Sequence, residues 1–275
     1  MSVEPQALDH TRDSDPDLVI DMRGVTIRRA QNVLLRDLNW QVELDERWVV
    51  LGKNGAGKTT LLALAAAQLH PSEGSVRILG ERLGKVDVFE LRPRIGLASA
   101  ALASRIPPGE RVSDIVISAG YSVMGRWREE YDSVDHGRAA SLLARWGVGH
   151  LADRDFGTLS EGERKRVQIC RALMTDPEML LLDEPAAGLD LAGREDLLGR
   201  LSEFAADPNA PAMVLVTHHV EEIPRDFTHL LMLRDGQTIR SGLLESELTE
   251  EAIFDTFGVP VHLTRRRGRY FASIV

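Results

Sequence analysis

A glycine-rich segment between residues 52 and 60 carries the residue types that bind phosphate. The pattern G-x-x-x-x-G-K-[ST] extends from Gly52 to Thr59. Glycines allow backbone N–H groups to curve around an anion without obstruction by Cβ atoms. We expect Lys58 to reach the β and γ phosphates of a nucleotide and the Thr59 hydroxyl to ligate Mg²⁺. The candidate nucleotide-binding residues of this loop are Gly52, Lys53, Asn54, Gly55, Ala56, Gly57, Lys58, Thr59 and Thr60.

The segments on either side of this loop have the patterns of a strand and a helix. Residues 48–51 form a short apolar run typical of a buried strand. Residues 61–69 are rich in Leu and Ala, which favours a helix whose positive N-terminal end faces the same phosphate. The order strand, glycine loop, helix is the context that the motif requires. It disfavours the structural alternative, a glycine-rich turn with an exposed lysine.

Two carboxylates follow a second buried strand. Residues 179–182 are apolar without alternation, and Asp183 and Glu184 come directly after them. Such a strand lies in a parallel sheet, whose carboxyl ends open into the crevice that holds ligands. We expect Asp183 to hold the Mg²⁺ shell and Glu184 to orient and polarise the attacking water. A solvated turn is the alternative, and the phosphate loop makes it the weaker one.

The segment 159–163 precedes a strongly amphipathic stretch. Ser160 and Glu163 have the spacing of a capping box, which is a structural explanation for both residues. Gly162 does not fit that explanation, because glycine in a first turn weakens a helix and is not needed for capping. A second phosphate that approaches this helix end closely would account for it.

Taken together, these segments resemble the ATP-binding cassette (ABC) ATPases, from about Leu18 to Gly242. Residues 159–163 resemble the family signature LSGGQ, with Glu161 and Glu163 as departures from it. Residues 178–184 are similar to the Walker B segment with its catalytic glutamate, 187–190 to the D-loop, 214–218 to the strand that ends in the switch histidine, and 230–242 to the strand–turn–strand that follows, with Asp235 and Gly236 in the turn.

The resemblance implies an α/β fold: a P-loop NTPase (ABC ATPase) core with a mixed sheet, an inserted α-helical subdomain and an N-terminal antiparallel β subdomain. The ABC ATPase domain would span residues 18–245, with the helical subdomain at roughly 100–160. Residues 246–275 would form a C-terminal tail packed on the ATPase core. We expect residues 1–17, which are acidic and contain proline, to be disordered.

The resemblance also implies how the site is assembled. In this family two cassettes face head to tail, so ATP bound to one loop meets the signature of the other subunit. Ser160 and Gly162 would touch the γ phosphate held by a partner, in a homodimer or a heterodimer. Asp190 of the D-loop would also contact nucleotide, and His218 would contact the γ phosphate and the attacking water. His219 is expected to be structural.

Two positions depart from the family pattern. Arg29 stands where an aromatic residue usually stacks on adenine. Its guanidinium plane could stack on a base, or it could be an exposed arginine at a strand end. Ala100 stands where the Q-loop glutamine joins the metal site to the transport partner. Nothing in the sequence shows that the neighbouring Ser99 replaces the glutamine.

Composition excludes several classes of protein. The formal charge of −9 is unlike that of a general nucleic-acid binder, so we expect no direct nucleic-acid partner. The longest apolar stretch, residues 61–69, is far shorter than the about 20 residues of a membrane span. We expect no signal peptide, and the single cysteine, Cys170, fits a reducing cytosol. Lysine is scarce, with only four in the chain.

The remaining segments yield weaker predictions. Helices are expected within 112–117, 139–146 and 252–257. Residues 121–131 mix aromatics with charges and would form either a partner surface or a solvated loop. The basic run 265–269 favours a charged hairpin over a site for lipid head groups or RNA.

The predicted function is that of an ATPase subunit of an ABC transporter. It would hydrolyse MgATP to drive a separate transmembrane permease, importer-type by analogy, from the cytoplasmic face of the cell membrane. The alternative is a soluble ABC ATPase that acts on ribosomes or nucleic acid. A P-loop kinase or other NTPase is disfavoured by the full set of motifs. The transported substrate cannot be read from this chain.

Overall fold

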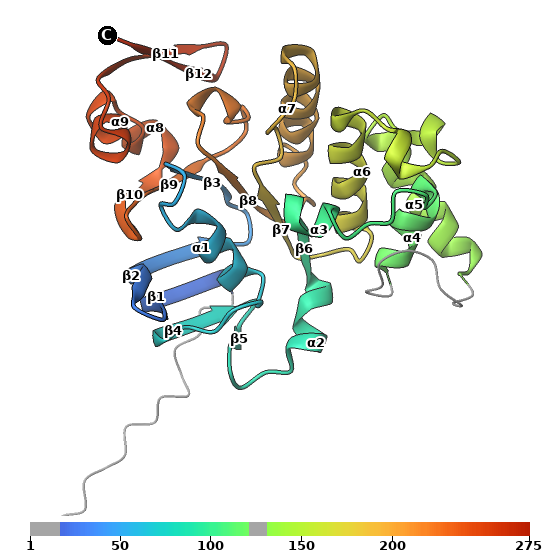
Figure 1. Cartoon of the computed structure of the whole chain (residues 1–275), viewed down its shortest axis with the longest axis horizontal. Helices are drawn as coiled ribbons and strands as arrows, with labels where there is room; N and C mark the ends of the chain where they lie inside the picture. Colours follow the sequence, from blue (N-terminus) through green and yellow to red (C-terminus); the bar gives the residue numbers. More distant parts are fainter. Residues whose placement is uncertain (1–16, 121–130) are drawn as a thin grey trace, which may run out of the picture.

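The computed structural model describes residues 17–120 and 131–275. The expectations for residues 1–16 and 121–130, a disordered start and a partner surface or loop, concern residues outside this description. Helices pack on both faces of a central sheet, and a smaller antiparallel sheet lies beside it (Figure 1).

The central sheet has the strand order β10-β9-β3-β8-β7-β6. Strands β9, β3, β8, β7 and β6 are parallel, and β10 is antiparallel to β9, so the sheet is mixed as predicted. Their bounds are Arg47–Gly52 (β3), Ile95–Ala98 (β6), Met179–Asp183 (β7), Ala212–Thr217 (β8), His229–Arg234 (β9) and Gln237–Leu243 (β10).

Side chains of the central strands alternate between two hydrophobic cores. In β3, Val49 and Leu51 belong to the core under the helices α6 and α7, whereas Trp48 and Val50 face the core shared with α1 and the smaller sheet. The same alternation holds in β7, where Leu180 and Leu182 lie on the first side. Burial on both faces explains why these strands are uninterrupted apolar runs in the sequence.

The smaller sheet has the order β2-β1-β4-β5, with every pair antiparallel. Its strands are Leu18–Arg29 (β1), Asn32–Glu43 (β2), Glu73–Ile78 (β4) and Glu81–Arg82 (β5). This is the N-terminal antiparallel β subdomain that the resemblance implied.

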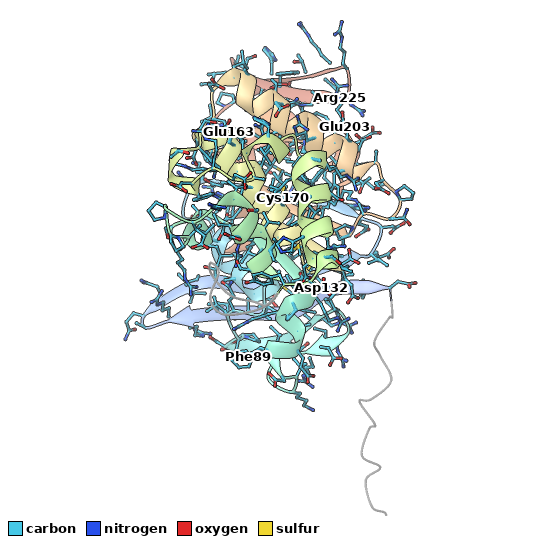
Figure 2. All side chains as sticks on the ribbon, turned by 90° about the vertical axis from the view of Figure 1, so that its right-hand side faces the viewer. Phe89, Asp132, Glu163, Cys170, Glu203 and Arg225 are labelled. Atoms are coloured by element: carbon cyan, nitrogen blue, oxygen red, sulfur yellow. The ribbon has the colours of Figure 1, made fainter. Side chains whose placement is uncertain are left out.

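The helices gather mainly at one end of the central sheet (Figure 1). Helices α4, α5 and α6 pack on one another, and Figure 2 shows this side with Asp132 at the start of α5 and Glu163 at the start of α6. Cys170 of α6 is fully buried there, and burial raises the pKa of its thiol. The bounds are Lys58–Ala65 (α1), Val88–Leu91 (α2), Ala100–Ala103 (α3), Val112–Ala119 (α4), Ser133–Arg145 (α5), Glu161–Leu173 (α6) and Leu191–Ala205 (α7).

The C-terminal residues form Leu244–Glu247 (α8), Glu250–Phe257 (α9), Val261–Arg266 (β11) and Arg269–Ile274 (β12). Strands β11 and β12 pair as the hairpin predicted for the basic run. The hairpin is attached to the core through Arg269, which is buried and donates a 2.9 Å hydrogen bond to Glu195 of α7. Arg269 also donates to the backbone carbonyl of Glu221, just after β8.

The helix expected at residues 61–69 differs from the observed one. Helix α1 begins at Lys58, within the phosphate loop, and ends at Ala65. Ala67 then has φ of 51°, a left-handed conformation that stops the helix and turns the chain toward β4. Leu69 is consequently exposed, although its apolar type suggested a helical position.

Candidate active site

The glycine loop leaves β3 and enters α1 at the carboxyl edge of the central sheet. Gly57 has φ of 102°, and a Cβ atom on it would lie 2.8 Å from Leu35 Cδ2. A Cβ atom on Gly52 would lie 2.5 Å from the carbonyl oxygen of Leu233 on β9. By contrast, a Cβ on Gly55, whose φ is 82°, would meet nothing within 4 Å. Two glycines therefore let the loop pack against its neighbours, and Gly55 supplies a turn on the open side.

The Lys58 side chain is held by the loop itself. Its Nζ donates hydrogen bonds to the carbonyl oxygens of Gly52 at 2.7 Å and Lys53 at 3.0 Å, and it lies 3.8 Å from Glu184 Oε1. Burial lowers the pKa of this ammonium group, while the charges of Glu184 and Asp183 act in the opposite direction. The ammonium group is thus fixed at the centre of the loop, where a phosphate would sit.

The two predicted carboxylates stand opposite the loop, at the end of β7. Burial raises the pKa of Asp183, and the adjacent Glu184 charge adds to that shift. Glu184 has φ of 47°, and its N–H donates a 2.9 Å hydrogen bond to the carbonyl of Val216 on β8. A left-handed non-glycine residue at a strand end is uncommon and is often found at functional sites.

His218 follows β8, the strand that pairs with both β3 and β7. Its Nδ1 lies 3.0 Å from Glu184 Oε1. The backbone here is fixed by buried Thr217, whose hydroxyl hydrogen-bonds to the Glu222 carboxylate and accepts from the N–H of His219 at 3.1 Å. The structure therefore brings together the phosphate loop, the two carboxylates and His218, which lie far apart in the sequence.

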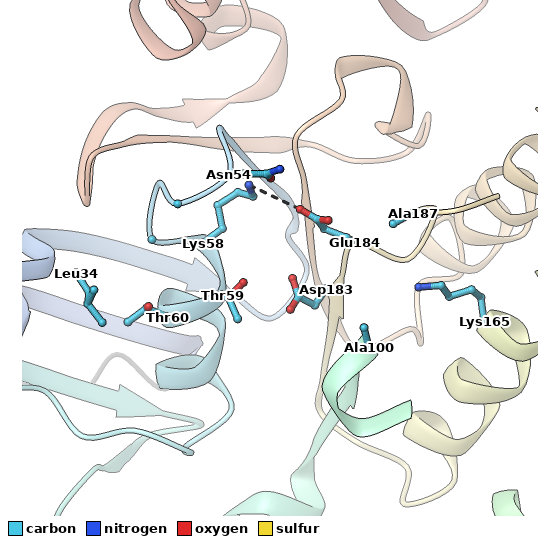
Figure 3. Close-up of a pocket in the computed structure, with 12 residues that line it drawn as sticks. Leu34, Asn54, Lys58, Thr59, Thr60, Ala100, Lys165, Asp183, Glu184 and Ala187 are labelled. Carbon is cyan, nitrogen blue, oxygen red and sulfur yellow. Dashed lines mark ion pairs between the residues drawn. The ribbon is translucent and has the colours of Figure 1, made fainter. Parts of the chain in front are cut away.

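A cavity of about 540 Å³ lies between the loop and the carboxylates (Figure 3). Its donor set suits a magnesium nucleotide. Lys58 and the loop face phosphate, and the Thr59 hydroxyl and Asp183 carboxylate supply the hard oxygen ligands that Mg²⁺ prefers. The lining residues are Leu34, Asn54, Gly55, Gly57, Lys58, Thr59, Thr60, Ala100, Lys165, Asp183, Glu184 and Ala187.

Comparison with known proteins agrees with this geometry. Residues 35–187, more than half of the chain, match the family described as ABC transporter. The chain belongs to the ABC transporter family. It is an ATP-binding subunit of an ABC transporter and an ABC-type ATP hydrolase, with the P-loop NTPase fold that the motifs predicted.

The ABC relatives cover nearly the whole chain. The uncharacterized ABC transporter ATP-binding protein YlmA of Bacillus subtilis is 38% identical over 257 residues, 93% of this chain and 97% of that protein. The molybdenum import ATP-binding protein ModC of Photobacterium profundum is 33% identical over 81% of this chain and 60% of that protein. A solved ABC transporter assigned to the metal-chelate type, in an inward-facing conformation, matches with a TM-score of 0.74 at 26% identity, over 94% of this chain and 97% of that chain.

The signature of this ABC cassette begins helix α6 and does not line the cavity. Ser160 and Glu163 form the predicted capping box: the Ser160 N–H donates to the Glu163 carboxylate at 2.7 Å, and the Glu163 N–H donates to the Ser160 hydroxyl at 3.4 Å. The hydrogen bond from the Ser160 backbone lowers the pKa of Glu163. A Cβ atom on Gly162 would meet only Leu189 Cδ2, at 3.9 Å. Packing within the chain therefore does not require this glycine.

The D-loop residue Asp190 also lies outside the cavity lining. Its carboxylate accepts a 2.7 Å hydrogen bond from the N–H of Gly193 and caps helix α7. Asp190, Ser160 and Gly162 are thus not among the residues that line the cavity of their own chain.

The two departures from the ABC pattern have clear positions. Arg29 is exposed at the end of β1 and is not among the residues that line this cavity. Ala100 does line the cavity, as the first residue of α3. The hydroxyl of Ser99 accepts a 3.3 Å hydrogen bond from the N–H of Leu102 and caps that helix, and Ser99 is not among the residues that line the cavity.

Sequence reasoning missed Lys165, which lines the same cavity from α6. The scarcity of lysine was the available signal, since Lys165 and Lys58 are two of only four lysines in the chain. Within the described residues, none of the helices has the length and apolar composition to cross a lipid bilayer.

Proposed function

We propose that this chain hydrolyses MgATP in the cavity between its glycine loop and β7 and thereby drives a separate transmembrane permease. The observation that carries this proposal is the placement of Lys58 and Glu184, which line the cavity 3.8 Å apart, with His218 in contact with the Glu184 carboxylate. An importer-type role at the inner face of the cell membrane is the form that we favour.

In this proposal each side chain has a defined task. Lys58 exchanges its hydrogen bonds to Gly52 and Lys53 for the β and γ phosphates, at little cost because the ammonium group is already in place. Glu184 orients the attacking water and accepts its proton. His218, in the tautomer protonated at Nδ1, donates a hydrogen bond to Glu184 Oε1 and so holds the carboxylate toward the water. The glycine loop N–H groups orient the phosphates.

Thr59 and Asp183 would hold Mg²⁺. Among the described residues, groups of three or more His, Cys, Asp or Glu side chains that could hold a metal ion are absent. A site with few protein ligands suits Mg²⁺, which is usually bound through one or two protein oxygens together with substrate phosphates. When bound, the metal neutralises charge on the phosphate oxygens.

The second half of each site would come from another subunit. Ser160 and Gly162 stand at the N-terminus of α6, a 13-residue helix whose positive end favours an anion. The open space at Gly162 supports the approach of a partner's nucleotide, since a Cβ atom there would meet only Leu189, the residue before Asp190. We propose a homodimer or heterodimer of cassettes with ATP at the interface.

Co-purification tests the transport role. The chain is expressed with an affinity tag in its own cells, and membranes are solubilised in mild detergent before capture. The proposal predicts recovery of a polytopic membrane protein in stoichiometric amount, and ATP hydrolysis that rises when the two proteins are reconstituted together. Recovery with ribosomes and without a membrane protein would instead support the soluble alternative.

The direction of transport has its own test. The similarity to proteins named for molybdenum import and phosphonates import supports import, and the similarity to a protein named for Nod factor export makes the test necessary. In proteoliposomes that carry the permease with this ATPase on one face, import moves substrate toward the face that holds the ATPase. Movement away from that face would show export and overturn the importer assignment.

A further inference from the structure

Lys165 of α6 is a buried lysine that points into the nucleotide cavity. Its side chain is 8% exposed, and it lines the cavity opposite the glycine loop, as Figure 3 shows. The chain has four lysines, and Lys58 and Lys165 both line this one cavity. Buried lysines are rare, because an ammonium group loses its hydration unless an anion or hydrogen-bond acceptor replaces the water.

The ammonium group of Lys165 has no partner among the residues that the structure describes. In residues 17–120 and 131–275, no acceptor lies within hydrogen-bond or ion-pair distance of it, whereas Lys58 has two carbonyl oxygens within 3.0 Å. Its charge acts on Asp183, but the two groups form no ion pair. The aliphatic part of Lys165 is thus covered by the fold while its unpaired ammonium group opens onto the cavity, a placement that suits contact with an anionic ligand.

The surroundings of Lys165 leave its path to the cavity open. Ala100 and Ala187 line the cavity near its ammonium group, and their methyl groups neither bind an anion nor fill the space (Figure 3). The hydroxyl of Ser99 is turned to the cap of α3. On this side of the cavity, which is lined by Ala100, Lys165 and Ala187, Lys165 therefore supplies the positive charge.

The charged residues that line the cavity indicate which part of a nucleotide Lys165 would contact. Asp183 and Glu184 place two carboxylates where the terminal phosphate of a nucleotide would lie, and Lys58 supplies one positive charge in return. Repulsion between these carboxylates and a phosphate is offset when a second cation stands on the same side. The signature residues Ser160 and Gly162 do not line this cavity, so α6 contributes only Lys165 to the site of its own subunit.

We propose that Lys165 binds the terminal phosphate of ATP in its own subunit, opposite Lys58, and so makes the site prefer ATP to ADP. The inference rests on the proposed nucleotide site. Because ADP lacks the phosphate that Lys165 contacts, removal of this lysine weakens the binding of ATP without weakening the binding of ADP. If Lys165 only packed α6 against the core, its removal would weaken the binding of both nucleotides to the same extent.

Titration calorimetry with the β,γ-imido analogue of ATP and with ADP, both with Mg²⁺, tests the assignment. In Lys165→Met the dissociation constant for the ATP analogue should rise by about tenfold or more, as expected for the loss of one charge-assisted contact. The dissociation constant for ADP should stay within about twofold of the wild-type value. Lys165→Arg keeps the charge and retains most of the preference. Lys85→Met, which removes an exposed lysine far from the cavity, is the control and behaves as wild type.

Three outcomes would contradict the inference or its basis. Equal losses for the two nucleotides in Lys165→Met would assign the lysine a structural role, and unchanged affinities would show that it does not contact phosphate. Wild-type protein that fails to bind the ATP analogue would overturn the proposed function itself. If the Met variant does not fold, Lys165→Gln provides the same comparison with a polar side chain of similar length.

Discussion

Glu184 Oε1 lies 3.0 Å from His218 Nδ1, and this pair joins two segments that are separated by 34 positions in the sequence. The same oxygen is 3.8 Å from Lys58 Nζ. The backbone of Glu184 is anchored to β8 by its hydrogen bond to Val216, so the pair depends on the pairing of β7 with β8. The sheet therefore determines the position of the carboxylate that we propose as the base.

Lys58→Ala should weaken nucleotide binding. The substitution removes the buried ammonium group at the centre of the loop and leaves the phosphates without their charge partner. We expect the dissociation constant for ATP to rise by about tenfold or more, which corresponds to at least about 1.4 kcal/mol. Titration calorimetry measures the effect, with exposed Lys85→Ala as the matched control. Equal affinities in Lys58→Ala and wild type would remove Lys58 from the site.

His218→Ala should slow turnover more than it affects binding. The histidine contacts Glu184 and does not line the cavity, so its loss disturbs the orientation of the carboxylate more than the capture of ATP, even if it also touches the γ phosphate as the family resemblance implies. We expect kcat to fall by about 10²-fold and KM to change by less than about threefold. Exposed His150→Ala serves as the control in steady-state phosphate release. A rise in KM with normal kcat would show that His218 acts in binding.

Much of this arrangement could be predicted from local pattern. Residues 48–51 and 179–182 are apolar on both faces because β3 and β7 are covered on both faces, so they were predictable as strands. The turn at Asp235 and Gly236, both with positive φ, joins β9 and β10 as the dipeptide indicated. The end of α1 was not predictable, because Ala67 adopts its left-handed conformation only where the chain turns toward β4.

The Glu163 cap should make stability depend on pH. In the folded chain the hydrogen bond from the Ser160 backbone holds the pKa of Glu163 below its ordinary value of 4.5. A depressed pKa contributes stability above the unfolded-state value and loses it as pH falls through the folded-state value. The free energy of unfolding of Glu163→Gln should therefore lie below that of wild type at pH values above about 5.5, by under about 1 kcal/mol. This difference should shrink as the pH falls below about 5.5.

Urea unfolding at a series of pH values measures this difference. Glu203→Gln, on the exposed face of α7, is the control and should show a smaller pH dependence. A difference for Glu163→Gln that grows as the pH is lowered would mean that the carboxylate has a raised pKa and does not cap α6 as an anion.

Arg269→Ala should destabilise the protein through the C-terminal hairpin. Arg269 is 7% exposed and bonds both to Glu195 on α7 and to the backbone after β8, so its removal breaks both attachments of the hairpin and leaves a space where the buried side chain stood. We expect the free energy of unfolding to fall by about 1.5–3 kcal/mol. Arg266→Ala, an exposed arginine of the same hairpin, should cost less than about 0.5 kcal/mol. Similar losses in the two variants would show that Arg269 does not anchor the hairpin.

The residues that sequence reasoning missed depend on tertiary contact. Lys165 follows the signature in an amphipathic helix, and its local pattern does not distinguish a solvated lysine from one that faces a cavity. Only the packing of α6 beside β6 brings it near enough for its charge to act on Asp183. Arg269 likewise belongs to a basic run in which each arginine has the same local context, and only the fold distinguishes the buried one.

The most direct test of the account is ATP turnover by Glu184→Gln, measured together with oligomeric state. Phosphate release should fall by about 10²-fold or more, because the proposed base is lost while the binding groups remain. Size-exclusion chromatography with light scattering should then show a dimer that accumulates with ATP and not with ADP. Glu203→Gln should hydrolyse ATP as wild type does. Near-normal hydrolysis by Glu184→Gln would contradict the central claim that this carboxylate activates water at the site.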